Sequence, residues 1–332
     1  MSSSRPAPNC PPLAIPGGGV DSSNVFCNET GHYDTYGEQP IKLLYFYNKN
    51  DTSLNASALI PWCEKESPRL IGRSKISQEV RSDADIMAAN PHVQLGGHYH
   101  PTECTPRGRL KLAVLVVYRD RKEHLQILLN NLHPFLQRQQ RDYTIFIVEQ
   151  TGNATFNRGM LFNVGFAEAS KLRDFDCFVF HDVDLLPEND RNSYSCPEVP
   201  TLLSSVMDKF KYKPLYNDYF GGVVSFSSSQ FRDINGYPNV YWGWGGEDDD
   251  LGQRVRFKFG KQGRAALDIG HYTMIKHADD PGNPKNPERF KILGQARKRF
   301  TTDGLSSLSY LLLNYELRPL YTWILVDIGQ PP

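Results

Sequence analysis

The residues best suited to chemistry form one acidic run, Glu247-Asp248-Asp249-Asp250. Four consecutive carboxylates repel one another, so we expect at least one of them to have a raised pKa and to accept a proton near neutral pH if the run lines a site. The alternative is structural, because carboxylates in the first turn of a helix that begins at Glu247 interact favourably with the helix dipole. The run therefore predicts a general base, with a purely structural helix start as the alternative.

A glycine and tryptophan segment comes directly before the acidic run, and it consists of Trp242, Gly243, Trp244, Gly245 and Gly246. The glycines allow the backbone to bend sharply, and the tryptophans offer flat faces on which a ring-shaped ligand can stack. This combination predicts a mobile lid over a sugar site.

A second acidic motif, Asp182 and Asp184, directly follows the apolar run 177–180. Two carboxylates at this spacing can face a divalent ion that also holds a diphosphate, although a turn with Asx hydrogen bonds gives the same pattern. Met274 and His277, three residues apart, are close enough to face one ion. Taken as an isolated pair, they are more typical of a core methionine and a surface histidine.

Three arginines, Arg119, Arg121 and Arg158, are expected near the ends of neighbouring strands. Guanidinium groups at such positions suit phosphate oxygens. The alternative for any one of them is a solvated charge at the start of a helix.

The elements that would position these residues alternate between strand and helix. Apolar, β-branched runs predict strands at 112–118, 143–148 and 177–180, and leucines at helical spacing after Arg121 and the segment 157–172 predict helices between them. This order predicts a parallel, Rossmann-like sheet that binds its ligand at the carboxyl ends of the strands. A dinucleotide-dependent oxidoreductase is disfavoured, because no G-x-G-x-x-G follows the first strand.

Composition narrows the class of protein. The chain has 332 residues, 39% of them hydrophobic, with 37 Lys and Arg balancing 37 Asp and Glu. A balanced charge argues against nucleic acid as a partner, and no apolar run approaches the roughly 18 residues that cross a bilayer. Residues 1–60, rich in Pro, Gly, Ser and Asn, predict a stem with one possible strand at 41–47, and 61–332 predict a single catalytic domain.

The cysteines and glycosylation sequons indicate a compartment. The six cysteines are Cys10, Cys27, Cys63, Cys104, Cys177 and Cys196. They show no C-x-x-C spacing, which disfavours a zinc cluster and leaves disulfides or buried thiols. Four N-x-S/T sequons, at Asn28, Asn50, Asn55 and Asn153, favour a lumenal or extracellular protein.

Several motifs together resemble the animal β-1,4-galactosyltransferase family, glycosyltransferase family 7. In one collinear order between Cys63 and Gln330, they are Phe156-Asn157-Arg158, Phe178 to Leu185, Tyr219 to Val223, Ile234 to Asn239, Trp242 to Asp250 and Asp303 to Leu308. The resemblance implies an α/β fold of GT-A type, a Rossmann-like, mostly parallel sheet with helices on both faces and a D-x-D metal site. It also implies a Golgi type II membrane protein with its catalytic domain in the lumen, and we expect the membrane anchor to lie outside this sequence.

The activity that the resemblance implies is inverting transfer of galactose from UDP-galactose to the 4-hydroxyl of terminal N-acetylglucosamine on glycoprotein or glycolipid glycans. Mn²⁺ would be held by Asp184, Met274 and His277. Glu247 and Asp248 would be the catalytic pair, with Asp248 taking the proton from the acceptor. Two alternatives are transfer of N-acetylgalactosamine from UDP-N-acetylgalactosamine and a glycan-binding protein without catalysis.

The resemblance also assigns binding residues and disulfides. The donor site would comprise Val117, Tyr118, Arg119, Asp120, Arg121, Phe156, Asn157, Arg158, Val183, Asp184, Tyr219, Trp244, His277, Ala278 and Asp279. The acceptor site would comprise Tyr216, Gly246, Glu247, Asp248, Asp249, Arg289 and Phe290. The implied disulfides are Cys63 with Cys104 and Cys177 with Cys196, whereas Cys10 and Cys27 lie outside the match.

Some positions depart from the family pattern, and others distinguish its branches. Val117-Tyr118 stands where the family commonly has Pro-Phe, and Ala278-Asp279 stands where a serine and a basic residue are usual. Gly246 favours an N-acetylglucosamine acceptor over xylose, because the xylose branch carries a bulky residue there. Tyr219 favours galactose over N-acetylgalactosamine as the transferred sugar.

Overall fold

The computed structural model describes residues 60–278 and 280–331, which belong to one compact unit. The helices are α1 (Asp83–Ala89), α2 (Lys122–Arg138), α3 (Arg158–Leu172), α4 (Ser228–Asp233), α5 (Glu247–Phe259), α6 (Arg289–Leu293) and α7 (Ala296–Arg299). The predicted strand at 41–47, almost all of the predicted stem, Cys10 and Cys27 lie outside the described residues. None of the described helices is long and apolar enough to cross a bilayer.

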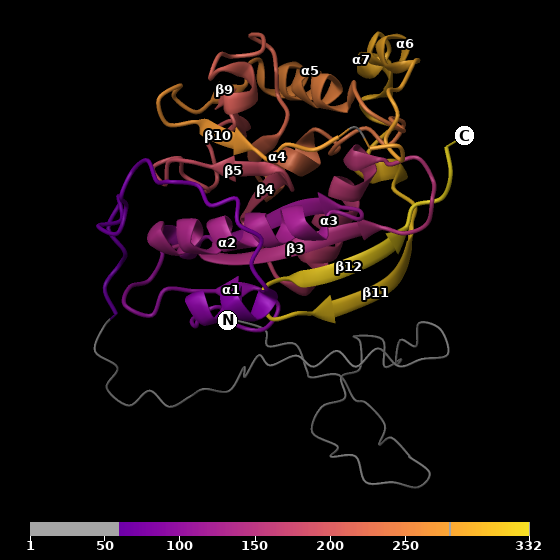
Figure 1. Cartoon of the computed structure of the whole chain (residues 1–332). Coiled ribbons are helices and arrows are strands. Elements are labelled where there is room, and N and C mark those ends of the chain that lie inside the picture. The colour runs from indigo at the N-terminus through magenta and orange to yellow at the C-terminus, as the bar shows by residue number, and fades with distance from the viewer. Residues whose placement is uncertain (1–59, 279, 332) are drawn as a thin grey trace, which may run out of the picture. The chain divides into compact units, whose positions relative to one another are not determined.

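The strands form one large sheet and one small sheet (Figure 1). The large sheet contains β1 (His98–Tyr99), β2 (Lys111–Tyr118), β3 (Asp142–Gln150), β4 (Cys177–Asp182), β6 (Thr201–Leu202), β8 (Val223–Ser227), β9 (Gly263–Arg264), β11 (Leu311–Leu317) and β12 (Thr322–Asp327). The small sheet contains β5 (Leu185–Pro187), β7 (Val206–Met207) and β10 (His271–Met274). The three strands predicted at 112–118, 143–148 and 177–180 are present as β2, β3 and β4.

The centre of the large sheet is parallel. The order of its strands is β11-β12-β3-β2-β4-β8-β6-β9, and β12, β3, β2 and β4 all run in the same direction. β11 and β8 join this centre antiparallel, one on each side. Four parallel strands bring their carboxyl ends to one edge of the sheet, as the sequence predicted.

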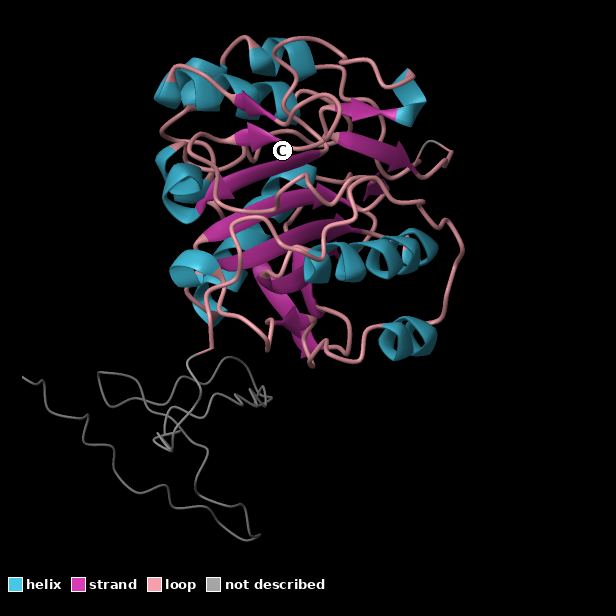
Figure 2. Ribbon diagram, turned by 90° about the vertical axis from the view of Figure 1, so that its left-hand side faces the viewer, coloured by secondary structure: helices cyan, strands magenta, loops and turns pink. Residues whose placement is uncertain are grey.

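Helices cover both faces of this sheet, as Figure 2 shows. Leu112, Val114 and Val116 of β2 pack in the core that contains the apolar side of α2, whereas Ala113 and Leu115 pack in the core that contains α3. Side chains alternate between the two faces of a strand, so a strand buried on both faces needs an uninterrupted apolar sequence. The sequence of β2 is continuously hydrophobic because the strand lies between two layers of helices.

Two disulfides are present among the described residues, Cys63–Cys104 with an S–S distance of 2.09 Å and Cys177–Cys196 with 2.04 Å. Both pairings implied by the resemblance are confirmed. Cys177 is the first residue of β4, so its disulfide ties the start of a central strand to the loop at Cys196.

Candidate active site

The candidate site lies at the carboxyl ends of β2 and β4. β4 extends further than predicted, because His181 and Asp182 still pair with Val116 and Val117 of β2. Asp182 is therefore the last residue of a strand, and Asp184 lies in the turn that follows it. The two carboxylates of the D-x-D motif accordingly face different neighbours.

Backbone pairing brings the predicted metal ligands together. Met274 pairs with Leu185 across β10 and β5, and the Ile275 N–H donates to the Asp184 carbonyl at 2.8 Å. This register carries His277 back to Asp184, where its Nε2 lies 3.0 Å from the Asp184 Oδ2. Two neighbouring ligands of an octahedral ion, each about 2.1 Å from it, are separated by about 3 Å. The spacing of Asp184 and His277 therefore fits one shared ion.

The chemistry of the donor set limits which third ligand is available. No group of three His, Cys, Asp or Glu residues suited to a metal occurs in the part of the chain that the structure describes. A third protein ligand would therefore be the thioether of Met274, as the resemblance implies. The hydrogen bond with Asp184 raises the pKa of His277, so a bound cation would replace a proton shared between these side chains.

The two arginines after β2 are held by contacts from other segments. Arg119 donates to the carbonyls of Ala154 (2.6 Å) and Gly282 (2.9 Å), and its guanidinium lies 5.2 Å from the centre of the Phe156 ring. Arg121 lies 3.8 Å from Asp280. A planar cation beside an aromatic ring at a strand end suits a base and its phosphates.

Arg158, the first residue of α3, joins the D-x-D motif to the acidic run. Its Nε donates to Asp182 at 2.7 Å and its Nη1 donates to Asp248 at 2.6 Å, while Glu247 lies 3.6 Å away. Its Nη2 is buried and has no hydrogen-bond partner among the described residues. One guanidinium therefore serves three carboxylates and keeps one donor free.

Burial sets the protonation of this cluster. Removal from water raises the pKa of Asp248 to about 8 and that of Asp182 to about 6, and it also raises the pKa of Glu247, although Arg158 opposes each change. Repulsion from neighbouring carboxylates contributes less than burial. A proton acceptor in the acidic run was predicted, but mutual repulsion was the wrong leading cause.

The four acidic residues occupy the first turn of α5, as the structural alternative predicted. Successive residues of a helix point about 100° apart, so each carboxylate meets a different environment. Asp249 accepts a hydrogen bond from the Tyr216 hydroxyl at 2.6 Å. Asp250 is fully buried and accepts hydrogen bonds from Arg254 and Arg299, each at 2.8 Å. Helix start and reactive cluster are therefore both present in one run.

The segment before α5 requires its glycines. Gly243, Gly245 and Gly246 have φ values of 84°, 103° and 102°, a region that other residues rarely adopt. The Trp244 side chain between them is 58% exposed, and its backbone bonds to Pro284 and Asn286 at 2.9 and 3.0 Å. An exposed tryptophan on a glycine-rich segment fits the predicted lid.

The predicted acceptor residues lie beside this segment. Arg289 packs against Gly245 and Gly246, and its guanidinium lies 4.3 Å from the ring centre of Phe290, which is 69% exposed. A Cβ atom at Gly246 would lie 2.5 Å from Tyr241 and 3.2 Å from the Arg289 Cβ. A larger residue at Gly246 would therefore clash with the Tyr241 ring and press against Arg289.

Two tyrosines lie on the same side of the site. Tyr216 and Tyr219 pack edge to face with ring centres 5.5 Å apart. The negative charge of Asp248 contributes to the raised pKa of Tyr219, after burial, so the phenol lies close to the proposed base. Gly221 also packs against Asp248, and a Cβ there would overlap the carboxylate.

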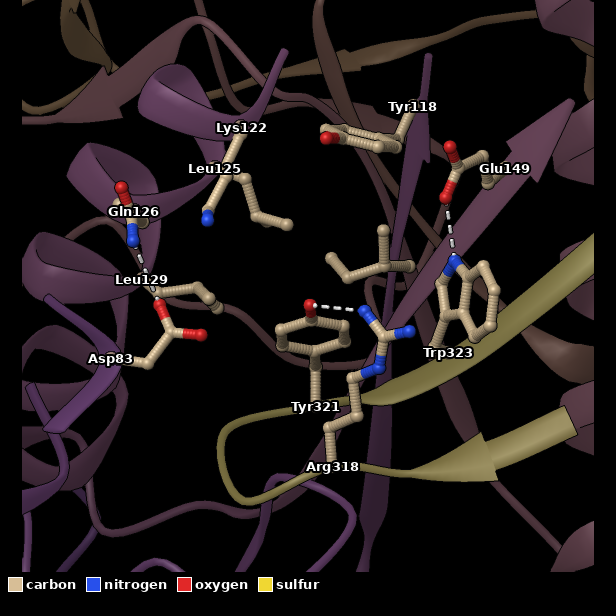
Figure 3. Close-up of a pocket in the computed structure, with 11 residues that line it drawn as sticks. Asp83, Tyr118, Lys122, Leu125, Gln126, Leu129, Glu149, Arg318, Tyr321 and Trp323 are labelled. Carbon is tan, nitrogen blue, oxygen red and sulfur yellow. Dashed lines mark hydrogen bonds between the residues drawn. The ribbon is translucent and has the colours of Figure 1, made fainter. Parts of the chain in front are cut away.

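Several predicted site residues point elsewhere. The Asn157 side chain is buried, caps α3 by accepting from the Met160 N–H, and donates to the Asn239 carbonyl. Tyr118 lines a separate cavity of about 270 Å³ beside α2, together with Lys122, Glu149 and Trp323 (Figure 3). Any donor contact from these two side chains would require rearrangement.

The remaining predicted positions have different surroundings. Val117 is buried, Val183 packs against the core on the α2 side, and Ala278 is exposed. Asp120 has a φ of 50° in the loop after β2. Asp279 lies outside the described residues.

Sequence reasoning left out two residues that the structure places beneath the site, and it expected a different partner for a third. Asp182 was considered as a carboxylate that could face a divalent ion, but it bonds to Arg158. Arg254 and Arg299 were not assigned a role, and both donate hydrogen bonds to the buried Asp250. The spacing of Asp250 and Arg254, four residues apart on a helix, was a usable signal, whereas nothing local indicates Arg299.

Two family models match this chain. Residues 63–197 match the model described as the N-terminal region of glycosyl transferase group 7, and residues 201–278 match the model described as the N-terminal domain of galactosyltransferase. Together the two matches cover more than half of the chain.

Two individual proteins similar to this chain support the same family. The chain is 49% identical to β-1,4-galactosyltransferase 3 of Bos taurus over 275 residues, which is 82% of this chain and 69% of that protein. It is 42% identical to β-1,4-galactosyltransferase 1 of Homo sapiens over 328 residues, which is 98% of this chain and 79% of that protein.

A solved structure extends the comparison to the fold. A mutant of Drosophila β-1,4-galactosyltransferase 7, in complex with manganese, UDP-Gal and xylobiose, is 29% identical with a TM-score of 0.57, covering 66% of this chain and 94% of that one. The expected GT-A type fold is confirmed. The chain therefore belongs to the β-1,4-galactosyltransferase family, glycosyltransferase group 7, and is a galactosyltransferase.

Proposed function

We propose that this enzyme transfers galactose from UDP-galactose to the 4-hydroxyl of a terminal N-acetylglucosamine, with inversion at the anomeric carbon and with Asp248 as the general base. The observation that carries the proposal is the position of Arg158. It bonds at once to Asp182 at the end of β4 and to Asp248 at the start of α5. The end of β4, next to the proposed metal ligand Asp184, is thereby connected through Arg158 to the proposed base.

The residues at the carboxyl ends of the strands suit the parts of a UDP-sugar donor. A UDP group at the carboxyl end of β2 would find Arg119 and Phe156 for its base and Arg121 for its phosphates. A Mn²⁺ ion held by Asp184, Met274 and His277 would supply positive charge that stabilises the departing diphosphate. The solved relative was crystallised with manganese and UDP-Gal, and the 3.0 Å spacing of Asp184 and His277 suits such an ion.

Proton transfer is assigned to Asp248. Its raised pKa makes it a stronger base than an ordinary aspartate, so it can take the proton of the acceptor hydroxyl as that oxygen attacks the anomeric carbon. Attack from the face opposite to the departing UDP inverts the configuration in one displacement. Only one protein base is needed, and Arg158 holds its carboxylate in place before the acceptor arrives.

The acceptor assignment rests on the space beside Gly246. The absence of a side chain there leaves room for Arg289 to pack against the lid, with Phe290 exposed next to it. We infer that these residues receive the N-acetyl group of N-acetylglucosamine. The structural relative was solved with xylobiose, so a xylose acceptor is the competing assignment to test.

We also place the catalytic domain in the lumen of the Golgi apparatus. Two disulfides are present among the described residues, and both suit an oxidising compartment. The sequon at Asn153 lies on an exposed turn after β3, where a glycan can be accommodated.

The direct test replaces the base. Asp248→Asn keeps the size of the side chain but removes its ability to accept a proton, so we expect kcat to fall by about 10²–10⁴ while UDP binding changes little. UDP release with UDP-galactose, Mn²⁺ and N-acetylglucosamine measures kcat, and calorimetry measures UDP affinity. Asp268→Asn, on an exposed turn, is the matched control and should retain activity. Activity of Asp248→Asn within a few-fold of the parent would remove Asp248 from this role.

A further inference from the structure

A second cavity, of about 230 Å³, lies at the amino end of β3, away from the candidate active site. It is lined by residues from four segments, 63–70, 106–107, 139–141 and 190–193. The segment 139–141 directly precedes β3, which begins at Asp142. The cavity is therefore at the opposite edge of the sheet from the strand ends that carry Arg119 and Asp184.

Arg141 lines this cavity with part of its hydrogen-bonding capacity unused. Its Nη2 donates to the Ser193 hydroxyl at 2.8 Å, but its Nε is buried and has no partner among the described residues. Burial lowers the pKa of Arg141, and no nearby carboxylate offsets that effect. A partly buried guanidinium with a buried, unpaired Nε and no counter-charge is unfavourable, and an anion in the adjoining cavity would relieve it.

Gln140, next to Arg141 in the chain, has an unused hydrogen-bond acceptor. The Gln140 Nε2 donates to Glu103 at 2.8 Å, whereas its Oε1 is buried and has no partner among the described residues. A ligand that satisfied both residues would need an acceptor oxygen for Arg141 and a hydrogen-bond donor for Gln140. A bare anion meets only the first of these needs, whereas a group that carries both an anionic oxygen and a hydroxyl meets both.

The charges around the cavity favour an anion. The carboxylate of Asp190 already accepts hydrogen bonds from Arg138 at 2.6 Å and from the Ile71 and Gly72 N–H groups. Glu66 pairs with Arg191 at 3.7 Å. The other acidic lining residue, Glu64, is exposed to solvent.

The basic residues Lys65 and Arg107 also line the cavity, and neither makes an ion pair with any residue that the structure describes. Together with Arg141 they provide three cations without a bonded carboxylate, against one lining carboxylate, Glu64, that is also without an ion pair in the described part of the chain. The unpaired charges that line the cavity are therefore positive on balance.

We propose that this cavity is a binding site for an acidic saccharide, that is, a sugar unit carrying a sulfate, phosphate or carboxylate group. The acidic group would accept hydrogen bonds from Arg141 and Arg107, and a sugar hydroxyl would donate to the Gln140 Oε1. This site is independent of the transfer reaction proposed above, and it needs neither the metal nor the donor nucleotide.

The test compares three probes at constant ionic strength: glucose 6-sulfate, inorganic sulfate and glucose. Isothermal calorimetry on the full chain should give saturable binding of glucose 6-sulfate, weaker binding of inorganic sulfate by about tenfold, and no binding of glucose, because only the first probe supplies both an anion and a hydroxyl donor. Equal binding of the two sulfates, or no binding of glucose 6-sulfate, would overturn the proposal.

Variants locate the binding. Arg107→Ala changes an exposed side chain and should leave folding intact. It should nevertheless weaken the binding of glucose 6-sulfate by about tenfold. Arg141→Gln should abolish the binding, provided that thermal unfolding shows a folded protein. Lys261→Ala removes an exposed cation outside the cavity and is the matched control. Unchanged affinity in Arg107→Ala, or an equal loss in Lys261→Ala, would show that the probe binds elsewhere.

Discussion

At the scale of single residues, Arg158 controls the reactivity of the site. It bonds to both Asp182 and Asp248, and the negative charge of Asp182 contributes to the raised pKa of Asp248. Arg158 favours the charged form of Asp248, whereas burial, Glu247 and Asp182 favour the protonated form. The proton affinity of the proposed base is therefore set first by burial, and then by the balance between one cation and two neighbouring carboxylates.

This balance predicts the pH dependence of the reaction. Asp248 acts only when deprotonated, and its pKa is raised, so kcat/KM should increase as the pH rises towards about 8 and then level off. Asp182→Asn removes a negative charge next to Asp248, which lowers the pKa of Asp248 and should shift the rising limb to lower pH. The measurement is kcat/KM against pH for both proteins, with Asp268→Asn as the control. If the rising part of the kcat/KM profile of Asp182→Asn stays at the same pH as in the parent, or moves to higher pH, the result would contradict this account.

We also propose, at the scale of single residues, that Tyr219 selects the donor sugar. Its ring packs against Tyr216, and its phenol lies near Asp248. We propose that in this position it occupies the space that the acetamido group of N-acetylgalactosamine would need. Exclusion by bulk contributes roughly 1–3 kcal/mol, so we expect UDP-galactose to exceed UDP-N-acetylgalactosamine by at least about tenfold in kcat/KM.

Substitution tests this assignment. Tyr219→Leu should narrow or abolish the difference between the two donors, whereas Tyr212→Phe, at a tyrosine that bonds to Glu188, should keep it. Competition between the two donors for one acceptor measures the preference. Equal use of both donors by the unmodified enzyme would place the chain among N-acetylgalactosaminyltransferases.

At the scale of elements, a buried ionic network supports the helix that carries the base. Asp250 of α5 bonds to Arg254 in the same helix and to Arg299 in α7, and Arg299 also bonds to Asp303 at 3.1 Å. Arg299 further donates to the Ile292 carbonyl in α6, the helix of Arg289. The network therefore joins the base helix to the proposed acceptor helix.

Removal of Arg299 should affect the acceptor more than the donor. Arg299→Ala leaves Asp250 buried with one cation fewer, at a cost of about 1–3 kcal/mol in the free energy of unfolding. Because Arg299 holds α6, we expect a higher KM for N-acetylglucosamine and an unchanged KM for UDP-galactose. Arg299→Lys should restore part of the loss. Equal increases in both KM values would indicate general damage instead of a link between the two helices.

Elements with strong local patterns could be predicted from the sequence. β2 is a continuous apolar run because both of its faces are buried, and α5 begins with four carboxylates because a helix start favours them. The antiparallel pairing of β10 with β5 could not be predicted, because β10 is only four residues long and its partner is 85 or more positions away. That pairing is what brings His277 to Asp184.

At the scale of the whole molecule, the sequence predicted the kind of site better than its internal contacts. The carboxyl ends of parallel strands must meet at one edge, which placed Arg119 and Asp184 together. The partners of Asp248 depend on Arg158, 90 positions earlier, and on the degree of burial. Burial is a property of the packed molecule, so the main cause of the raised pKa could not be read from the acidic run alone.

The most direct test of the central claim determines the product. The enzyme, UDP-galactose, Mn²⁺ and N-acetylglucosamine should give one disaccharide, whose proton NMR spectrum shows a β-configured galactose joined to the 4-position. Inversion is expected because Asp248 activates the acceptor for a single displacement and no covalent intermediate forms. An α-linked product, a linkage to another hydroxyl, or transfer to xylose in preference to N-acetylglucosamine would contradict the account.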